Sequence, residues 1–252
     1  MGLFGKSTDS SSPEFQALVT RWATYLKKLE SRYYEVLQQS EGPLNDIINN
    51  IQYDTVIIHN ITNGLKNQTV TQLCEKADTG WDKMEAEMEK IGASGNDISN
   101  QRIKAAEFKY WVEIEYEKYN IAIYAKAARK ILENVKKHID EEKMHKCTQC
   151  AGELPINVYS FMAINIKCDS CGSVNTYQPD DRVRALEYYV ISHLAEEHAF
   201  SEKLKSRTDK NAMKDYWKKY YRYLMENVPD KKEFYQRQMD ERLNNPYFTA
   251  FS

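Results

Sequence analysis

Two pairs of cysteines limit how this chain can fold more than any other feature of its sequence. Cys147 and Cys150 form one Cys-x-x-Cys pair, Cys168 and Cys171 form a second, and seventeen residues separate the pairs. Two residues between paired cysteines allow one tight turn to direct both sulfurs at the same metal ion. Because four thiolates complete a tetrahedral donor set, we predict that all four cysteines bind a single metal.

The residues around the cysteines predict a small antiparallel sheet. Apolar residues between the pairs follow the two-residue period of a strand, and they are Ile156, Val158, Met162, Ile164 and Ile166. The stretch GSVNTYQP after the second pair predicts a further short strand. Gly172, directly after Cys171, allows the positive φ that turns backbone N–H groups toward sulfur. A segment of roughly 35 residues buries too little surface to fold alone, so we expect the metal to supply folding free energy.

This segment resembles the C4 zinc ribbon, a rubredoxin-like module in which two knuckles hold one metal on a small sheet. The resemblance covers residues 145–179, and the four cysteines match the four ligand positions one by one. It departs at the first knuckle, where Ala151 precedes Gly152 and glycine often follows the cysteine directly. The resemblance implies a structural Zn²⁺ with every coordination position filled by protein. Iron binds the same four thiolates, so the donor set leaves iron as an alternative.

Most of the remaining chain carries apolar residues at helical spacing. We predict helices from Pro13 to Gly42-Pro43, over 44–65, over 70–91, from about Asp97 to about Lys143, over 180–205, over 209–227 and over 230–244. A loop is expected at 92–97. In the long helix, Ile114, Ile121, Ala128 and Val135 recur every seven residues, beside a second apolar stripe. This pattern is typical of a helix that packs between two neighbours in a bundle or coiled coil.

The predicted fold is therefore mainly α, an elongated helical bundle with long helices that is interrupted by a small antiparallel β zinc ribbon. The expected parts are a disordered N-terminus at 1–12, a helical bundle at 13–143, the ribbon at 144–179, C-terminal helices at 180–245 that pack with the bundle, and a tail at 246–252. The chain has only 9 glycines and 6 prolines in 252 residues, which agrees with long helices that need few tight turns.

Charge, hydropathy and cysteine usage limit the binding partners and the cellular compartment that we expect for the protein. The formal net charge is -2, so the chain as a whole does not attract nucleic acid or anionic membranes. No run of about 18 apolar residues occurs, so we expect no membrane span. Four of the five cysteines lie in tight pairs, which is not the pattern of a secreted disulfide framework. We therefore expect a reducing, cytoplasmic location.

One segment, residues 203–222, combines basic and aromatic residues. The residues in it that could bind nucleic acid are Lys210, Lys214, Lys218, Lys219 and Arg222. Such basic groups neutralise phosphates, while neighbouring tyrosine and tryptophan rings stack on bases. The segment also has a purely structural interpretation. One stripe at helical spacing consists of Met213, Trp217, Tyr220 and Leu224, which would face the bundle and leave the lysines on its solvated side.

The stretch HLAEEHAF at 193–200 raises the alternative of a catalytic metal. His193 and Glu197 lie four residues apart, but the HExxH motif is absent and His198 falls on a different helical face from His193. The sequence also contains no Ser/His/Asp set, no catalytic Cys/His signature and no glycine-rich phosphate loop. These observations favour a protein that is not an enzyme.

We predict a non-enzymatic scaffold or adaptor that binds zinc structurally and contacts a protein partner. The long helices would set distance, and the ribbon would present a rigid binding tip. The alternative is a nucleic-acid-binding protein that uses the ribbon and the basic face at 203–222, by analogy with other zinc ribbons. A metal-dependent enzyme built on His193, Glu197 and His198 is the third hypothesis. The sequence sets neither the partner nor whether the chain forms homo-oligomers.

Overall fold

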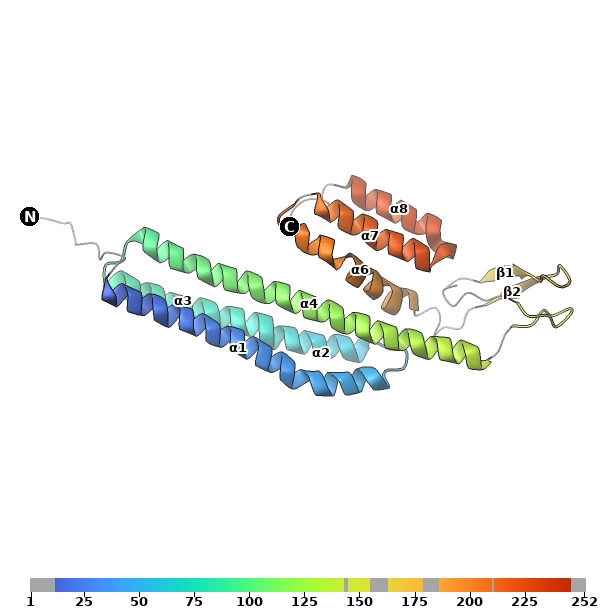
Figure 1. Cartoon of the computed structure of the whole chain (residues 1–252), viewed down its shortest axis with the longest axis horizontal. Helices are drawn as coiled ribbons and strands as arrows, with labels where there is room; N and C mark the ends of the chain where they lie inside the picture. The colour runs from blue at the N-terminus through green and yellow to red at the C-terminus, as the bar shows by residue number, and fades with distance from the viewer. Residues whose placement is uncertain (1–11, 143–144, 155–162, 179–185, 210, 246–252) are drawn as a thin grey trace, which may run out of the picture. The chain divides into compact units, whose positions relative to one another are not determined.

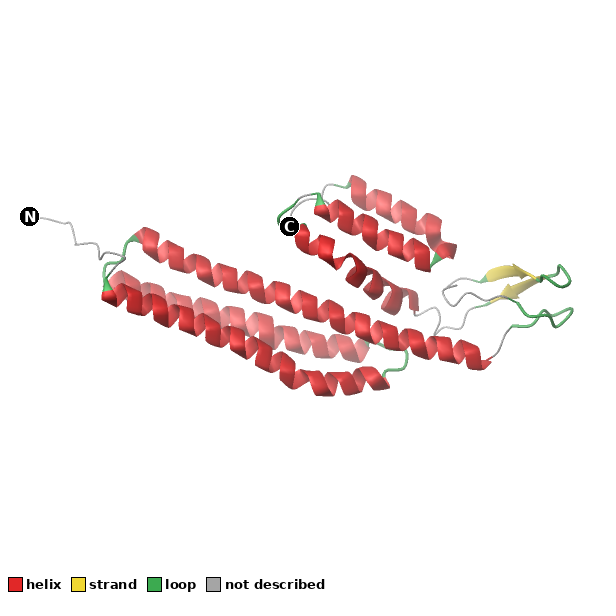
Figure 2. Ribbon diagram, viewed as in Figure 1, coloured by secondary structure: helices red, strands yellow, loops and turns green. Residues whose placement is uncertain are grey.

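The computed structural model describes residues 12–142, 145–154, 163–178, 186–209 and 211–245 (Figure 1). Residues 1–11 of the predicted N-terminal segment, the C-terminal tail, Lys210 and the strand residues Ile156, Val158 and Met162 lie outside these ranges. The described chain is mainly α with one two-stranded antiparallel sheet, as predicted (Figure 2). It divides into two compact units. Unit 1 comprises residues 1–46 and 59–120, and unit 2 comprises residues 47–58 and 121–252.

The first helix, α1, runs from Pro13 to Asn50. The N–H of Phe15 donates to the Ser12 hydroxyl at 3.2 Å, so Ser12 caps the N-terminus of this helix. The prediction that Gly42-Pro43 ends this helix is wrong, because α1 continues through Pro43. A proline inside a helix costs about 3 kcal/mol. Buried apolar residues continue along the same face on both sides of it, which offsets that cost, and they are Val36, Leu44 and Ile48.

The predicted helix over 44–65 is instead divided by a break at residues 51–55. Asn134 donates from its side-chain amide to the carbonyls of Ile51 at 2.7 Å and Gln52 at 3.2 Å. The Asp54 carboxylate accepts the N–H of Val56 at 2.8 Å, where the next helix begins. These side chains satisfy backbone groups on both sides of the break, which explains why a continuous apolar stripe does not form one continuous helix.

The helix α2, Val56–Lys66, continues through a π-helical turn, Asn67–Thr71, into α3, Gln72–Lys90. Gly92 ends α3 with a φ of 72°, and its N–H donates to the Glu89 carbonyl at 2.9 Å. The Ser94 hydroxyl then accepts the N–H of Asp97 at 3.2 Å. Because this cap starts the next helix early, the predicted loop at 92–97 is shorter than expected. The long helix α4 spans Gly95–Glu142, close to its predicted bounds.

Unit 1 has a core built from α1, α2, α3 and the first half of α4. The buried residues of α3 are Leu73, Ala77, Trp81, Met84 and Met88, which confirms the predicted stripe. Trp22 from α1 is fully buried against Trp81, with 5.6 Å between ring centroids, and its indole N–H donates to the Gln101 carbonyl at 3.3 Å. Large apolar side chains buried in this way contribute about 1.5–3 kcal/mol each.

Unit 2 contains the second half of α4, the cysteine segment and the C-terminal helices. A π-helical turn at Glu187–Ile191 leads into α6, Ser192–Lys205, which packs against α7, Ala212–Asn227. A short turn, Pro229–Lys231, connects α7 to α8, Lys232–Asn244. The three helices lie side by side in Figure 1. Within unit 2, Arg129 of α4 forms an ion pair with Glu197 of α6.

The cysteine segment forms the predicted small sheet. Strand β1, Ile164–Lys167, pairs antiparallel with β2, Val174–Tyr177. A separate antiparallel bridge joins Lys146 to Glu153 on the two sides of the first cysteine pair. The buried core of this segment consists of Cys147, Leu154, Ile166, Cys168 and Tyr177. Two of these five residues in the described part of the segment, Cys147 and Cys168, are predicted metal ligands.

Candidate metal centre

Each cysteine pair sits in a tight turn, and the two turns have the same backbone pattern. The N–H that follows the second cysteine donates to the carbonyl of the first, from Ala151 to Cys147 at 2.9 Å and from Gly172 to Cys168 at 2.8 Å. The N–H of each first cysteine in turn donates to a carbonyl five residues later, at 2.8 Å in both turns. The sequence therefore folds twice into the same knuckle.

Positive φ angles complete both knuckles. Gly172 has a φ of 75°, as predicted, and Ala151 has a φ of 59° at the equivalent position of the first knuckle. A residue with a Cβ costs roughly 1–2 kcal/mol in this left-handed conformation. The next position, Gly152, is too crowded for a larger residue, because a Cβ there would lie 3.0 Å from the Ser170 hydroxyl and 3.3 Å from the Cys150 sulfur. The first knuckle thus displaces its glycine by one residue and holds Ala151 in a strained conformation.

The knuckles bring the four predicted cysteines together. Their Sγ atoms all lie within 4.8 Å of one another, and two separations across the knuckles, Cys147 to Cys171 and Cys150 to Cys168, are 3.6 Å. A tetrahedral metal with thiolates at about 2.3 Å requires sulfurs about 3.8 Å apart. The cluster therefore fits one metal ion held by four sulfurs. It is the sole metal-ligating group of this kind in the described residues.

Two polar residues that the sequence analysis did not single out contact the sulfurs. The Ser173 hydroxyl lies 3.0 Å from the Cys147 sulfur and 3.1 Å from the Cys171 sulfur. The Asn175 side-chain amide donates to the Cys147 sulfur at 3.5 Å, and its carbonyl oxygen accepts the Thr148 N–H at 2.9 Å. Asn175 is buried on the core side of β2. A polar residue at an inward-facing position of a predicted strand is the sequence feature that could have pointed to it.

These hydrogen bonds favour the thiolate form at two of the four cysteines, Cys147 and Cys171. The Ser173 hydroxyl, followed by the N–H groups of Cys150 and Gln149, lowers the pKa of Cys147 to about 5. Ser173 also lowers the pKa of Cys171 through its hydroxyl and its N–H. At Cys150 the Gly152 N–H acts to lower the pKa, but the neighbouring sulfurs outweigh it and raise the pKa to about 12. Since the thiolate is the form that binds a metal, the cluster is prepared for a cation.

Access to the four sulfurs is uneven. Cys147 and Cys168 are buried, whereas Cys150 and Cys171 are exposed.

The fifth cysteine, Cys74, lies in unit 1 beside the core of α1, α2, α3 and α4, and burial raises the pKa of its thiol to about 11. Burial therefore favours the protonated form of Cys74, which packs against the core of unit 1.

The basic segment has partners within its own helices. Lys219 lies 3.0 Å from the Glu202 carboxylate, and Lys218 lies 3.4 Å from that of Asp215. Lys214 and Arg222 are exposed. The aromatic residues of the segment pack on one another along α7, and Tyr216 and Trp217 also contact cations of α6 and α8. Tyr216 and Tyr221 are buried, and the Trp217 ring lies 4.9 Å from the Arg242 guanidinium.

The third candidate site does not assemble. The His193 ring packs at a tilt against Tyr124 with 4.5 Å between ring centroids, and the His198 ring packs likewise against Tyr223 at 5.1 Å. Glu197 is engaged by Arg129. The two histidines and Glu197 thus have separate packing or ion-pair partners rather than a common centre. The enzyme hypothesis keeps one direct test, in which unchanged metal content after His193→Ala and His198→Ala would remove its basis.

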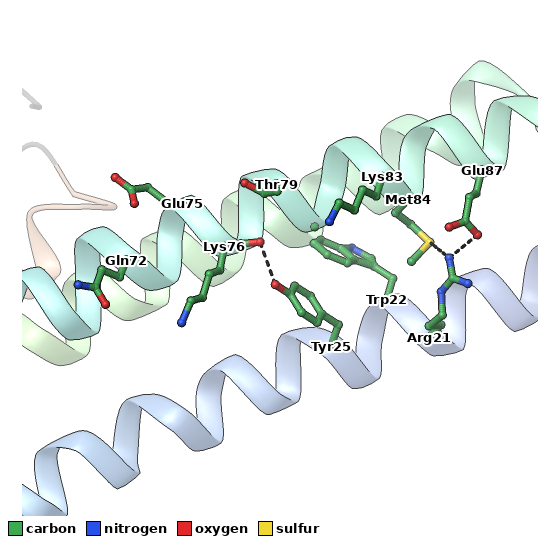
Figure 3. A pocket seen from close by; sticks show the side chains of 11 residues that line it. Arg21, Trp22, Tyr25, Gln72, Glu75, Lys76, Thr79, Lys83, Met84 and Glu87 are labelled. Atoms are coloured by element: carbon green, nitrogen blue, oxygen red, sulfur yellow. Dashed lines mark hydrogen bonds and ion pairs between the residues drawn. The ribbon is translucent and has the colours of Figure 1, made fainter.

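A groove of about 570 Å³ lies in unit 1 between α1 and α3 (Figure 3). Tyr25 reaches from α1 and donates its hydroxyl to the Lys76 carbonyl at 3.1 Å. Gly80 makes room for that ring, because a Cβ there would lie 2.5 Å from it. Arg21 and Glu87 form an ion pair at the rim. Beside this groove α1 and α3 approach closely, and their approach depends on the absence of a side chain at Gly80.

Comparison with known proteins adds no family to this description. No protein-family model, no curated protein and no solved structure matches the chain. No helix of the described residues combines the length and the apolar character needed to cross a membrane. The likeness to a zinc ribbon therefore rests on the cysteine spacing, the sulfur geometry and the two knuckles.

Proposed function

We propose that this chain is a non-enzymatic, zinc-binding adaptor of a reducing cytoplasmic compartment, in which the ribbon contacts a protein partner and the helices set distance. The observation that carries the proposal is the closed cluster of four sulfurs. The four cysteines would fill all four positions of a tetrahedral metal, which leaves no position for a substrate. A metal held in this way stabilises a small fold and leaves its surface free for contacts.

Zinc is the metal that this proposal names. Zn²⁺ has no redox chemistry of its own and accepts four thiolates in a tetrahedron without distortion. We expect protein purified without chelator to contain one zinc per chain, with the four ligand thiols protected from a thiol reagent. An iron site would show sulfur-to-metal absorption in the visible range instead. Freely titratable thiols with no bound metal would contradict the metal centre itself.

The outward face of the sheet is the proposed contact surface. It carries Asn165, Lys167, Val174 and Thr176, whose side chains alternate with the buried side chains of the same strands. Val174 is 66% exposed, the most exposed of the large apolar side chains described. It pairs across the strands with Lys167, so the face joins an apolar group to a basic one. Such a mixed surface suits a polar, modest-sized protein contact.

The adaptor proposal is tested by comparing protein capture by matched variants. Zinc-loaded full-length chain is used as bait beside Val174→Asp, which places a charge on the proposed face. The control is Phe234→Asp, which changes an apolar residue of α8 that is 45% exposed. We expect Val174→Asp to lose specific partners that wild type and Phe234→Asp retain. Equal capture by all three proteins would contradict the ribbon as the contact surface.

Nucleic-acid binding remains the alternative, and one titration decides between the two. The structure pairs Lys218 and Lys219 with carboxylates but leaves Lys214 and Arg222 exposed. Labelled single- and double-stranded oligonucleotides are titrated with zinc-loaded protein at low and physiological salt. The adaptor proposal expects no binding even at low salt. Affinity that falls steeply with salt, and that is lost when Lys214, Lys218 and Arg222 are changed to Glu, would replace it.

A further inference from the structure

The four sulfurs differ in how many side chains bond to them. Cys147 and Cys171 share the Ser173 hydroxyl, and Cys147 also accepts the Asn175 amide. We call these two cysteines the bonded pair. Cys150 and Cys168 form the open pair, which in the described part of the ribbon receives no side-chain donor other than its own sulfurs. Cys150 accepts one backbone N–H, from Gly152, whereas Cys147 accepts those of Gln149 and Cys150 besides its side-chain donors. Hydrogen bonds withdraw charge from a metal-bound sulfur, so when all four sulfurs are bound to the metal as thiolates, the open pair holds the more nucleophilic ones.

Solvent exposure and the Sγ–Sγ distance then indicate which sulfur of the open pair is oxidised first and which forms a disulfide with it. Cys150 is the exposed member of the open pair, and Cys168 lies behind it in the core. Their Sγ atoms are 3.6 Å apart, in different knuckles. Oxidation of cysteine follows nucleophilicity and access, and a nearby second thiolate converts the first oxidation product into a disulfide. Cys150 has both properties, and Cys168 is positioned as the resolving thiolate.

We propose that Cys150 is an oxidation site of the metal-bound ribbon, that Cys168 resolves it, and that the Cys150–Cys168 disulfide releases zinc. The inference rests on the proposed zinc site. With hydrogen peroxide as the oxidant, the Cys150 thiolate attacks one peroxide oxygen, the O–O bond breaks, and a sulfenic acid and hydroxide form. The Cys168 thiolate then attacks the sulfenic sulfur and expels a second hydroxide. Two protons from the buffer convert the hydroxides to water, each sulfur loses one electron, and the peroxide oxygens gain two.

Loss of these two thiolates breaks the metal site. The remaining ligands, Cys147 and Cys171, supply half of the tetrahedral donor set, which does not retain a structural zinc. The ribbon then loses the metal that supplements its core of a few residues. The proposed adaptor would therefore lose its contact surface under oxidant and regain it after reduction and zinc supply.

The experiment follows thiols and metal in the same samples. Zinc content of full-length protein is measured first, hydrogen peroxide is added in graded amounts, and free thiols are then alkylated. Peptide mass spectrometry identifies the first crosslink, and a coloured chelator measures released zinc. We expect Cys150–Cys168 as the first crosslink, with one zinc released per crosslinked chain. A first crosslink within one Cys-x-x-Cys pair, between Cys147 and Cys171, or no oxidation at all would overturn the inference.

Two variants and two controls sharpen the result. Ser173→Ala removes the donor of the bonded pair, so we expect Cys147–Cys171 crosslinks to appear and zinc release to accelerate about tenfold. Thr176→Ala removes an exposed hydroxyl of β2 that bonds Asn165, and should change neither. Cys74→Ser should also leave zinc release unchanged. Protein that holds no zinc before oxidant defeats the proposed metal site, whereas zinc-loaded protein with another crosslink defeats the oxidation site alone.

Discussion

The ribbon and the helices of unit 1 are stabilised in opposite ways. In the described part of the ribbon the core has five buried residues, two of them candidate metal ligands, and the four sulfurs of its two knuckles lie within 4.8 Å of one another. In unit 1 two apolar clusters run along long helices, and each buried residue supplies a small share of the total. The contrast teaches that stability concentrated in one centre is lost all at once, while distributed stability is lost in increments.

The largest expected effect comes from removing one ligand. Cys168→Ser takes away a buried thiolate of the cluster, and structural zinc supplies on the order of 10–16 kcal/mol to small metal domains. We expect the variant to lose bound metal and the ribbon fold while retaining most of its helical circular dichroism. Global loss of helical signal would show that the two regions do not differ in this way. Chelator treatment of wild type should reproduce the result.

A core substitution in unit 1 should have a smaller and purely local effect. Trp22→Ala removes a fully buried ring that contacts Trp81, which typically costs about 3–5 kcal/mol. We expect urea unfolding of the helices at lower denaturant and an unchanged metal content. Zinc loss in this variant would contradict the independence of the two regions.

Two glycine substitutions should change stability in opposite directions. Gly80→Ala places a Cβ where the Tyr25 ring lies, and overpacking of this kind costs about 1–3 kcal/mol. That loss outweighs the helix-propensity gain of about 1 kcal/mol. Gly64 has open space around its Cβ position, so Gly64→Ala should gain about 1 kcal/mol without a penalty. Thermal unfolding measures the change in Tm of both variants. Equal changes in Tm would show that the close contact at Gly80 does not oppose a larger residue.

The smallest predicted effect lies in the first knuckle. Ala151→Gly removes the strain of a positive φ and should tighten zinc binding by the equivalent of about 1 kcal/mol. Competition with a chelator of known affinity measures the change. Gly172→Ala creates the same strain in the second knuckle and should weaken binding by a similar amount. Unchanged affinity in both variants would mean that knuckle strain does not contribute.

Local sequence patterns were sufficient for several features of the molecule. The spacing of four cysteines predicted the sulfur cluster and the turns that hold it, because a Cys-x-x-Cys turn is set by the residues within it. Apolar spacing predicted the α3 stripe and the length of α4. Both features depend on neighbours a few residues apart, so the chain carries the information locally.

Other features depend on contacts between distant residues, which local patterns do not contain. Pro43 lies inside α1 because a buried face continues past it, and the break after Asn50 is held by Asn134, more than eighty residues away. Asn175 contacts Thr148 and the Cys147 sulfur across the ribbon, and the pairing of Lys219 with Glu202 depends on how α6 and α7 pack. Burial and hydrogen bonding across such separations arise when the chain is folded, and they decided which residues surround the sulfur cluster and which charges stay exposed.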